Sequence, residues 1–241
     1  MTKSYKAILF DAGDTLVRLA RPFAEIMLTV LAEAGFHTDR DRLEAAIREV
    51  FREADEASAN MPVATQTSDE VAKAYWLDLY LEIGRRAGLP GLALAHVTPI
   101  YEYLLAEQPF VAVAGAEELL AWCKGQGYRL GLVSNWGTDL RDLLGRLGLA
   151  RFFDTLVISA EVGMEKPSPR IFLQALKGLG VNAQDALMVG DDYVNDGMGA
   201  WAAGIDPLLV DVFDRFAAGT WPRVLSLADV KTYLEQGGVA K

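Results

Sequence analysis

Cysteine and histidine are scarce in this 241-residue chain, which has one cysteine and two histidines. The single Cys123 excludes an intramolecular disulfide and fits a reducing compartment, so we expect a cytoplasmic protein. Its apolar neighbours predict a buried structural thiol on a helix rather than a nucleophile. Neither His37 nor His96 has a metal-binding partner at a useful spacing, so structural or surface roles are expected for both.

Long apolar runs are missing as well, and positive charge is in deficit. No stretch approaches the roughly 18 apolar residues needed to cross a bilayer, and residues 1–6 lack the features of a secretory signal. The formal charge of −10 argues against a nucleic-acid partner held by phosphate contacts. We therefore expect neither a membrane nor a nucleic-acid partner. A monomer and a homodimer both remain possible.

Two patterns divide the chain. From about residue 17 to residue 108, apolar residues recur at helical spacing, with breaks at Gly35, residues 60–67 and residues 88–91. Residues 61–67 predict a loop, and Ser68 or Asp69 is expected to cap the helix that follows. The rest of the chain alternates short apolar runs with helical segments. Strands are predicted at residues 5–10, 129–134, 155–159, 186–190 and 207–211.

These strands are apolar on both faces, which is typical of a parallel sheet covered on both sides. Their alternation with helices predicts a doubly wound, Rossmann-like α/β sheet. We therefore predict a core domain of residues 1–16 and 109–241, with an all-helical cap domain of residues 17–108 inserted into it. The core helices are expected near residues 115–126, 138–147, 168–179, 194–204 and 226–236.

Polar residues of distinct types follow four of the predicted strands. Ligands of open α/β sheets bind beyond the carboxyl ends of the strands, so these residues are expected to converge. One carboxylate in such a place is most often a turn or cap residue, but the combination is far more specific. The residues are Asp11, then Ser134 and Asn135, then Lys166, and finally Asp191, Asp192 and Asp196.

This set has the properties needed for attack on a phosphate. A carboxylate nucleophile and a phosphate are both anions, so a cation must lie between them. Mg²⁺ prefers oxygen ligands, which Asp11, Asp191 and the backbone carbonyl of Gly13 can supply. The phosphate itself would be bound by hydroxyls and one positive charge, from Thr15, Ser134 and Lys166.

The segments that carry these residues resemble the four motifs of the haloacid dehalogenase (HAD) superfamily, and the resemblance extends through the whole chain. It implies Asp11 as nucleophile, Ser134 and Lys166 as phosphate binders and Asp191 as a magnesium ligand. Asp196 would orient Lys166 or metal-bound water, or serve as an alternative ligand. The helical insertion resembles a phosphatase-like subgroup whose cap lies between the first and second motifs. The motifs are at residues 10–16, 132–135, 163–167 and 189–196.

Four neighbouring residues have two possible roles. Asn135 either satisfies backbone groups or orients its loop near the substrate. For Asp192 a turn or N-cap role is favoured over metal ligation. For Trp136 and Trp201 a packing role is favoured over a contact with substrate.

Position 13 departs from the superfamily pattern, since its phosphatases carry an acid/base aspartate there. Gly13 can neither protonate a leaving group nor activate water. Acid–base help is typically worth about 10²–10⁴ in rate, so its loss should matter most with poor leaving groups. Asp14 could substitute only if an unusual turn redirected its side chain.

The leading hypothesis is a magnesium-dependent hydrolase of a small phosphorylated metabolite, acting through an aspartyl-phosphate at Asp11 and slow or leaving-group-selective because of Gly13. One alternative is a nearly inert member that binds a ligand or a protein. A second is a 2-haloacid dehalogenase, but such relatives use no metal, whereas this chain keeps Asp191 and Asp196. Phosphonate-cleaving relatives use a cap lysine, and the surroundings of Lys73 do not favour that role.

Overall fold

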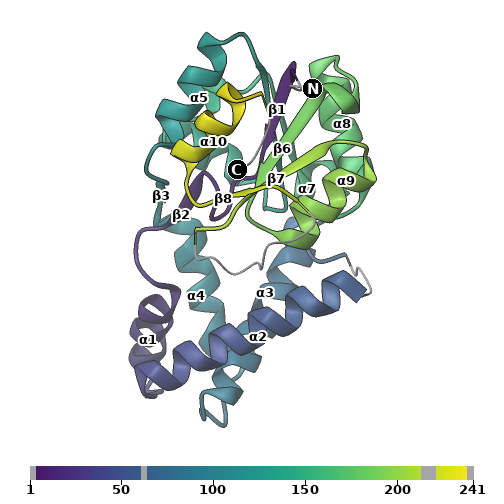
Figure 1. The fold of residues 1–241 in the computed structure, drawn as a ribbon. Coiled ribbons are helices and arrows are strands. Elements are labelled where there is room, and N and C mark those ends of the chain that lie inside the picture. The colour runs from purple at the N-terminus through teal and green to yellow at the C-terminus, as the bar shows by residue number, and fades with distance from the viewer. Residues whose placement is uncertain (1–3, 61–63, 213–220, 238–241) are drawn as a thin grey trace.

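The computed structural model describes residues 4–60, 64–212 and 221–237, and it has the predicted α/β fold. Six parallel strands form one sheet in the order β5-β4-β1-β6-β7-β8, with β1 in its interior (Figure 1). The five predicted strands are confirmed to within two residues at each end. The two-residue β8 was not predicted. The strands are β1 (Ala7–Phe10), β4 (Arg129–Ser134), β5 (Thr155–Ile158), β6 (Ala186–Gly190), β7 (Asp206–Val210) and β8 (Arg223–Val224).

Helices cover both faces of this sheet. The side chains of β1 alternate between two cores: Ile8 and Phe10 join one apolar cluster, and Ala7 and Leu9 join the other. Burial on both faces explains why the strand sequences are apolar throughout. The first face packs against α5 (Ala116–Gly125), α6 (Leu140–Arg146) and α10 (Leu227–Glu235), and the second against α8 (Pro169–Leu179) and α9 (Gly199–Ala202).

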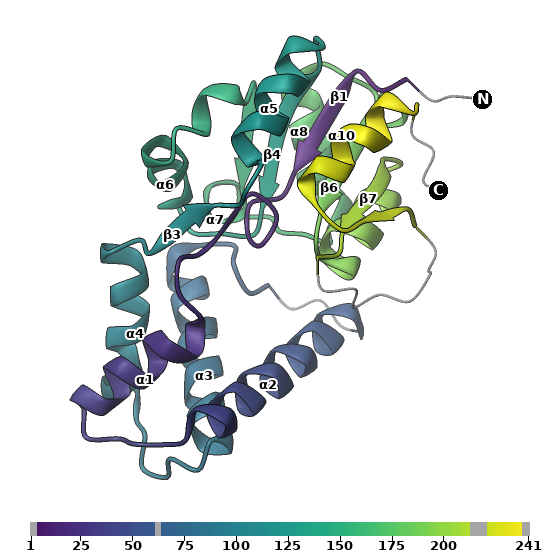
Figure 2. The same ribbon diagram turned by 60° about the vertical axis from the view of Figure 1, so that its left-hand side comes forward.

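Four helices form a separate group beyond the carboxyl ends of the strands, as Figures 1 and 2 show. They share an apolar cluster of their own, which includes Met27, Leu43, Ile83 and Ile100. Ser68 caps one of them as predicted, because its hydroxyl accepts a hydrogen bond from the Val71 N–H at 3.2 Å. The helices are α1 (Phe23–Glu33), α2 (Arg40–Asn60), α3 (Asp69–Arg86) and α4 (Leu94–Ala106).

Residues 17–19 do not begin a helical segment. They form strand β2 (Val17–Leu19), which pairs antiparallel with β3 (Phe110–Ala112). Figure 2 shows this two-stranded ribbon between the core sheet and the helical group. Three-residue strands with exposed positions carry no periodic pattern, so they could not be predicted from the sequence.

Two further expectations are refined by the structure. The helix expected at residues 194–204 is a π-helix, η3 (Tyr193–Met198), followed by the short α9. Of the loop predicted at residues 61–67, residues 61–63 lie outside the described part, and residues 64–67 are non-helical as predicted. The remaining short elements are α7 (Ser159–Val162), η1 (Ala150–Phe152) and η2 (Ala183–Asp185).

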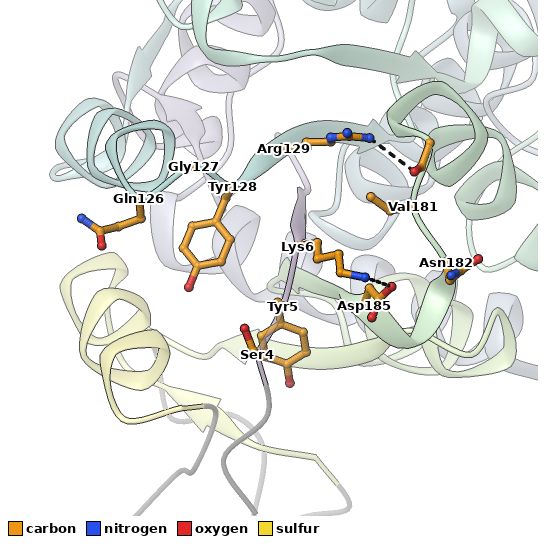
Figure 3. Close-up of a pocket in the computed structure, with 11 residues that line it drawn as sticks. Ser4, Tyr5, Lys6, Gln126, Gly127, Tyr128, Arg129, Val181, Asn182 and Asp185 are labelled. Atoms are coloured by element: carbon orange, nitrogen blue, oxygen red, sulfur yellow. Dashed lines mark hydrogen bonds and ion pairs between the residues drawn. The ribbon is translucent and has the colours of Figure 1, made fainter.

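An open cavity of about 500 Å³ lies at the opposite end of the sheet, where β1 and β4 begin. Its charged residues are already engaged: Lys6 is paired with Asp185 at 2.9 Å, and Arg129 donates to the carbonyl of Leu179 at the end of α8 (Figure 3). Among the described helices, none is long and apolar enough to span a membrane.

Candidate active site

Three parallel strands bring the first group of predicted residues together. Asp11 follows β1, Ser134 ends β4, and Asp191 follows β6. Because Phe10 lies opposite both Leu132 and Val189, the ends of these three strands lie within two residues of one another. The Ser134 hydroxyl donates to Asp11 Oδ1 at 3.1 Å, and Asp11 is buried.

Lys166 is the buried cation of this site. Its Nζ lies 2.6 Å from Asp11 Oδ1 and 2.6 Å from Asp196 Oδ1. Burial alone would lower the pKa of Lys166, but the two carboxylates outweigh that effect and raise it above its ordinary value. Lys166 therefore carries its charge throughout the physiological range.

Asn135 orients the loop that carries Lys166. Asn135 Oδ1 accepts from the Lys166 N–H at 2.8 Å, and Asn135 Nδ2 donates to the Lys166 carbonyl at 2.9 Å. This two-way contact satisfies backbone groups and fixes the loop at once, so the two roles considered for Asn135 coincide.

Three carboxylates form an acidic cluster beside Lys166. Ligand oxygens of Asp11, Asp191 and Asp196 all lie within 4.8 Å of one another. Burial, followed by the charges of Asp11 and Asp196, raises the pKa of Asp191 well above its ordinary value. Burial also raises the pKa of Asp196, although Lys166 acts in the opposite direction. A cluster short of positive charge and built from carboxylate oxygens could hold a hard divalent cation such as Mg²⁺.

Thr15 reaches the same cluster from the loop after β1, where Gly13 precedes it by two residues. The Thr15 hydroxyl donates to Asp191 Oδ1 at 3.2 Å, so it contacts a carboxylate of the cluster. The Gly13 carbonyl accepts from the Thr15 N–H at 2.6 Å and retains a second lone pair. The ligand role expected for Gly13 thus stays a prediction.

The loop after β6 is shaped to present Asp196. Asp192 is the N-cap of the π-helix, as favoured, since its carboxylate accepts from the N–H groups of Val194 and Asn195, both at 2.8 Å. Asp196 Oδ2 in turn accepts from the Asp192 N–H at 3.1 Å. A Cβ atom at Gly190 would lie only 2.2 Å from Asp196 Oδ2. The glycine is therefore required for this close approach, and π-turns of this kind occur often at functional sites.

Asp14 occupies an unusual turn three residues beyond Asp11. Its φ is 50°, in the left-handed region, and its side chain is exposed while Asp11 is buried. The unusual turn does exist, but it presents Asp14 to solvent. Its charge still contributes to the raised pKa of Asp191.

Trp136 lies beside Gly13. A Cβ atom at Gly13 would meet Cζ3 of the indole at 3.3 Å. The ring also packs edge-on against Phe110, with 5.1 Å between ring centroids, and its Nε1 donates to Asp139 at 3.4 Å. Trp136 therefore packs as favoured, yet it remains partly exposed.

Contacts between the helical group and the core were not visible in the sequence. The Glu165 carboxylate accepts from the N–H groups of Thr65 and Gln66, at 2.8 and 2.5 Å. The Asp69 carboxylate accepts from the N–H and the hydroxyl of Thr138, at 2.9 and 2.7 Å. These two joints connect the segment before α3 and its first turn to loops that carry the site.

Other expectations have mixed outcomes. Cys123 is buried, and burial raises the pKa of its thiol to about 12, as a structural role requires. His96 accepts from the Ala93 N–H through Nδ1 at 3.0 Å, and His37 is exposed. The packing role favoured for Trp201 is wrong, because this residue is 68% exposed on α9.

Comparisons with known proteins identify the family of this chain. Residues 5–204 match the family model for haloacid dehalogenase-like hydrolases. The chain is 33% identical to haloacid dehalogenase-like hydrolase domain-containing protein 3 of Mus musculus, covering 85% of this chain and 81% of that protein. It is 32% identical to glyceraldehyde 3-phosphate phosphatase of Methanothermobacter thermautotrophicus, covering 86% and 85%. The magnesium-bound HAD-hydrolase YfnB from Bacillus subtilis shares the fold, with a TM-score of 0.72, 21% identity and coverage of 96% and 99%. The chain belongs to the haloacid dehalogenase-like hydrolase family.

Proposed function

We propose that this hydrolase is a magnesium-dependent phosphatase of small phosphorylated metabolites, acting through an aspartyl-phosphate at Asp11. The observation that carries the proposal is the meeting of opposite charges at one sheet edge. Three carboxylates lie within 4.8 Å of one another, and the buried Lys166 contacts two of them. Charge of both signs is what a site needs to hold a cation and a phosphate together.

Asp11 is the group we assign to the attack on phosphorus. Lys166 and Ser134 both bind its Oδ1, which fixes the carboxylate and leaves Oδ2 for the reaction. An Asp11 oxygen forms a bond to phosphorus, and the bond from phosphorus to the leaving oxygen breaks. Water then cleaves the aspartyl-phosphate, which restores the carboxylate and releases phosphate.

The metal would be held by Asp11, Asp191 and Asp196, together with the Gly13 carbonyl. When bound, Mg²⁺ neutralises the repulsion between the carboxylates and the phosphate. Lys166, Ser134 and Thr15 would bind the phosphoryl oxygens from the protein side, with Asn135 keeping Lys166 in place. YfnB, which shares this fold, is bound to magnesium, and this supports a role for the metal here.

The helical group would supply the substrate side of the site. We assign residues 17–108 to a cap domain and residues 1–16 and 109–241 to the core, consistent with the separate apolar cluster of the four helices. The relative named glyceraldehyde 3-phosphate phosphatase supports a small phosphorylated substrate. A cytoplasmic protein that acts alone or as a homodimer fits this role.

The test is hydrolysis of acetyl phosphate with Mg²⁺ and with EDTA. We expect activity only with the metal, and we expect Asp11→Asn to lose it. Asp14→Asn is the matched control, because it removes a nearby carboxylate that is exposed. Full activity of Asp11→Asn, or of the EDTA-treated protein, would refute the mechanism. Failure of a beryllium fluoride complex to bind at Asp11 would favour an inert binding protein, and metal-independent halide release from a 2-haloacid would indicate a dehalogenase.

A further inference from the structure

Gly13 and Trp136 hold equivalent places on neighbouring loops. Gly13 lies two residues beyond Asp11, and Trp136 lies two residues beyond Ser134. Since β1 and β4 are parallel neighbours, both loops leave the sheet edge in the same direction, toward the helical group (Figure 2). The 3.3 Å approach places the six-membered ring of the indole where a side chain at position 13 would extend.

The indole is held from several sides. The backbone N–H of Trp136 donates to the Ser159 hydroxyl at 3.0 Å, and that hydroxyl donates to the backbone carbonyl of Trp136 at 3.2 Å. Phe110 supports the ring, and Asp139 accepts from its Nε1. A tryptophan fixed in this way, and still partly exposed, presents a ready-made apolar surface beside Gly13, two residues from Asp11.

Three carboxylates of the loop after β6 are already engaged, and a fourth, after β1, is exposed. Asp191 and Asp196 belong to the acidic cluster, Asp192 caps the π-helix, and Asp14 is exposed on its turn. The indole Nε1, the one proton donor on the Trp136 side chain, donates to Asp139. What faces position 13 is aromatic carbon, which cannot protonate a leaving oxygen.

The geometry points to Trp136 as a specificity-determining residue that receives an aryl leaving group, so that the substrates are aryl phosphate monoesters. This inference rests on the proposed function. In an in-line displacement the leaving oxygen lies opposite Asp11, and we place it on the outward side of the site, toward the Trp136 ring that borders position 13. The phosphorus–oxygen bond breaks with its electron pair on oxygen, and the aryloxide takes a proton from solvent water. An aryloxide is stable enough to depart without an acid, whereas an alkoxide is not.

The test compares kcat/KM for phenyl phosphate, glycerol 3-phosphate and acetyl phosphate at saturating Mg²⁺. The wild-type protein is expected to prefer the aryl ester over the alkyl ester by about 10² or more, the range of a missing acid. Trp136→Ala should raise KM for phenyl phosphate about tenfold, since both ring contact and apolar burial are lost. It should leave acetyl phosphate, which has no ring, nearly unchanged, while Trp136→Phe should retain most of the aryl preference.

Trp201→Ala is the matched control, because it removes an exposed tryptophan on α9 rather than the one that contacts position 13. An equal loss on phenyl phosphate and acetyl phosphate in Trp136→Ala would overturn the inference, since it would indicate a merely structural role. So would a wild-type protein that hydrolyses glycerol 3-phosphate as fast as phenyl phosphate. If instead the proposed function fails, no substrate, acetyl phosphate included, shows hydrolysis that depends on Asp11.

Discussion

Replacing Lys166 by methionine should destabilise the metal-free protein, and more so at high pH than at low pH. The side chain of Lys166 is 4% exposed, and those of its partners Asp11 and Asp196 are 9% and 1% exposed. Breaking a buried ion pair by removing one partner typically costs about 3–5 kcal/mol, because an uncompensated charge stays buried. Here two contacting carboxylates lose their cation together, so the upper part of that range is expected.

The pH dependence follows from the carboxylates left behind. Burial already raises the pKa of Asp196 from its ordinary 3.8 to about 7, while Lys166 opposes the rise. A raised pKa means that the folded state binds more protons than the unfolded state, so this group makes stability fall as pH rises through that window. Removing Lys166 raises the pKa of Asp196 further and extends the fall to higher pH. At about pH 5.5 protonation relieves much of the penalty, and at about pH 8 it does not.

The assay is urea denaturation in EDTA at these two pH values, followed by the fluorescence of the five tryptophans. Lys124→Met is the matched control, because Lys124 pairs with Asp154 at 2.8 Å where both side chains are more than a third exposed. Its loss should cost about 0–1 kcal/mol at either pH. A loss in Lys166→Met that is equal at both pH values, or no larger than in the control, would refute the reasoning.

Three further predictions concern the metal, the loop after β6 and the joint with the helical group. Mg²⁺ should raise the melting temperature more at pH 8 than at pH 5.5, because it competes with protons for Asp191 and Asp196. In scanning fluorimetry, Asp191→Asn should abolish most of that rise. An unchanged rise in this variant would count against the proposed metal site. Gly190→Ala should weaken Mg²⁺ binding about tenfold or more by calorimetry, since the new Cβ would lie 2.2 Å from Asp196 Oδ2, and unaltered affinity would contradict the close approach. Glu165→Gln should raise KM more than it lowers kcat, because its carboxylate joins the segment before α3 to the core. Glu161→Gln, which removes only an exposed pair with Arg141, is the control, and equal effects of the two would sink this assignment.

The parts of the fold that could be predicted from the sequence are those whose side chains show by their polarity whether they are buried. Residues 129–134 and 186–190 are almost entirely buried, so their apolar runs marked the strand bounds without error. The ribbon of β2 and β3 could not be found in this way. Its two strands are three residues long and more than 90 residues apart, and they are fixed by pairing with each other rather than by local pattern. The exposure of Trp201 could not be predicted either, because an aromatic residue in a helical pattern does not reveal which face of the helix it occupies.

The site residues that stand at the ends of parallel strands could be predicted from the sequence. Contacts between two segments far apart in the sequence could not. Asp11, Ser134 and Asp191 stand at strand ends, so a parallel sheet was enough to bring them together. Glu165 meets Thr65 and Gln66 across 100 and 99 positions of sequence, and no motif marks either side of that contact. The π-turn that presents Asp196 depends on the N-cap at Asp192, which an ordinary helical pattern conceals.

The glycine at position 13 is explained by its contact with Trp136 rather than by the backbone conformation. The positive φ of this turn falls on Asp14, at 50°, whereas Gly13 itself does not adopt the left-handed region, so the backbone does not demand a glycine there. A side chain at position 13 would crowd its surroundings instead, since its Cβ would lie 3.3 Å from Cζ3 of Trp136 and the indole would have to shift by a few tenths of an ångström. Gly13 and Trp136 therefore form one unit, in which an aromatic surface stands where a proton donor would be. A carboxylate added at position 13 would supply a proton donor, but it would also displace the indole of Trp136. We therefore expect that both residues have to be changed together to alter which leaving groups the site accepts.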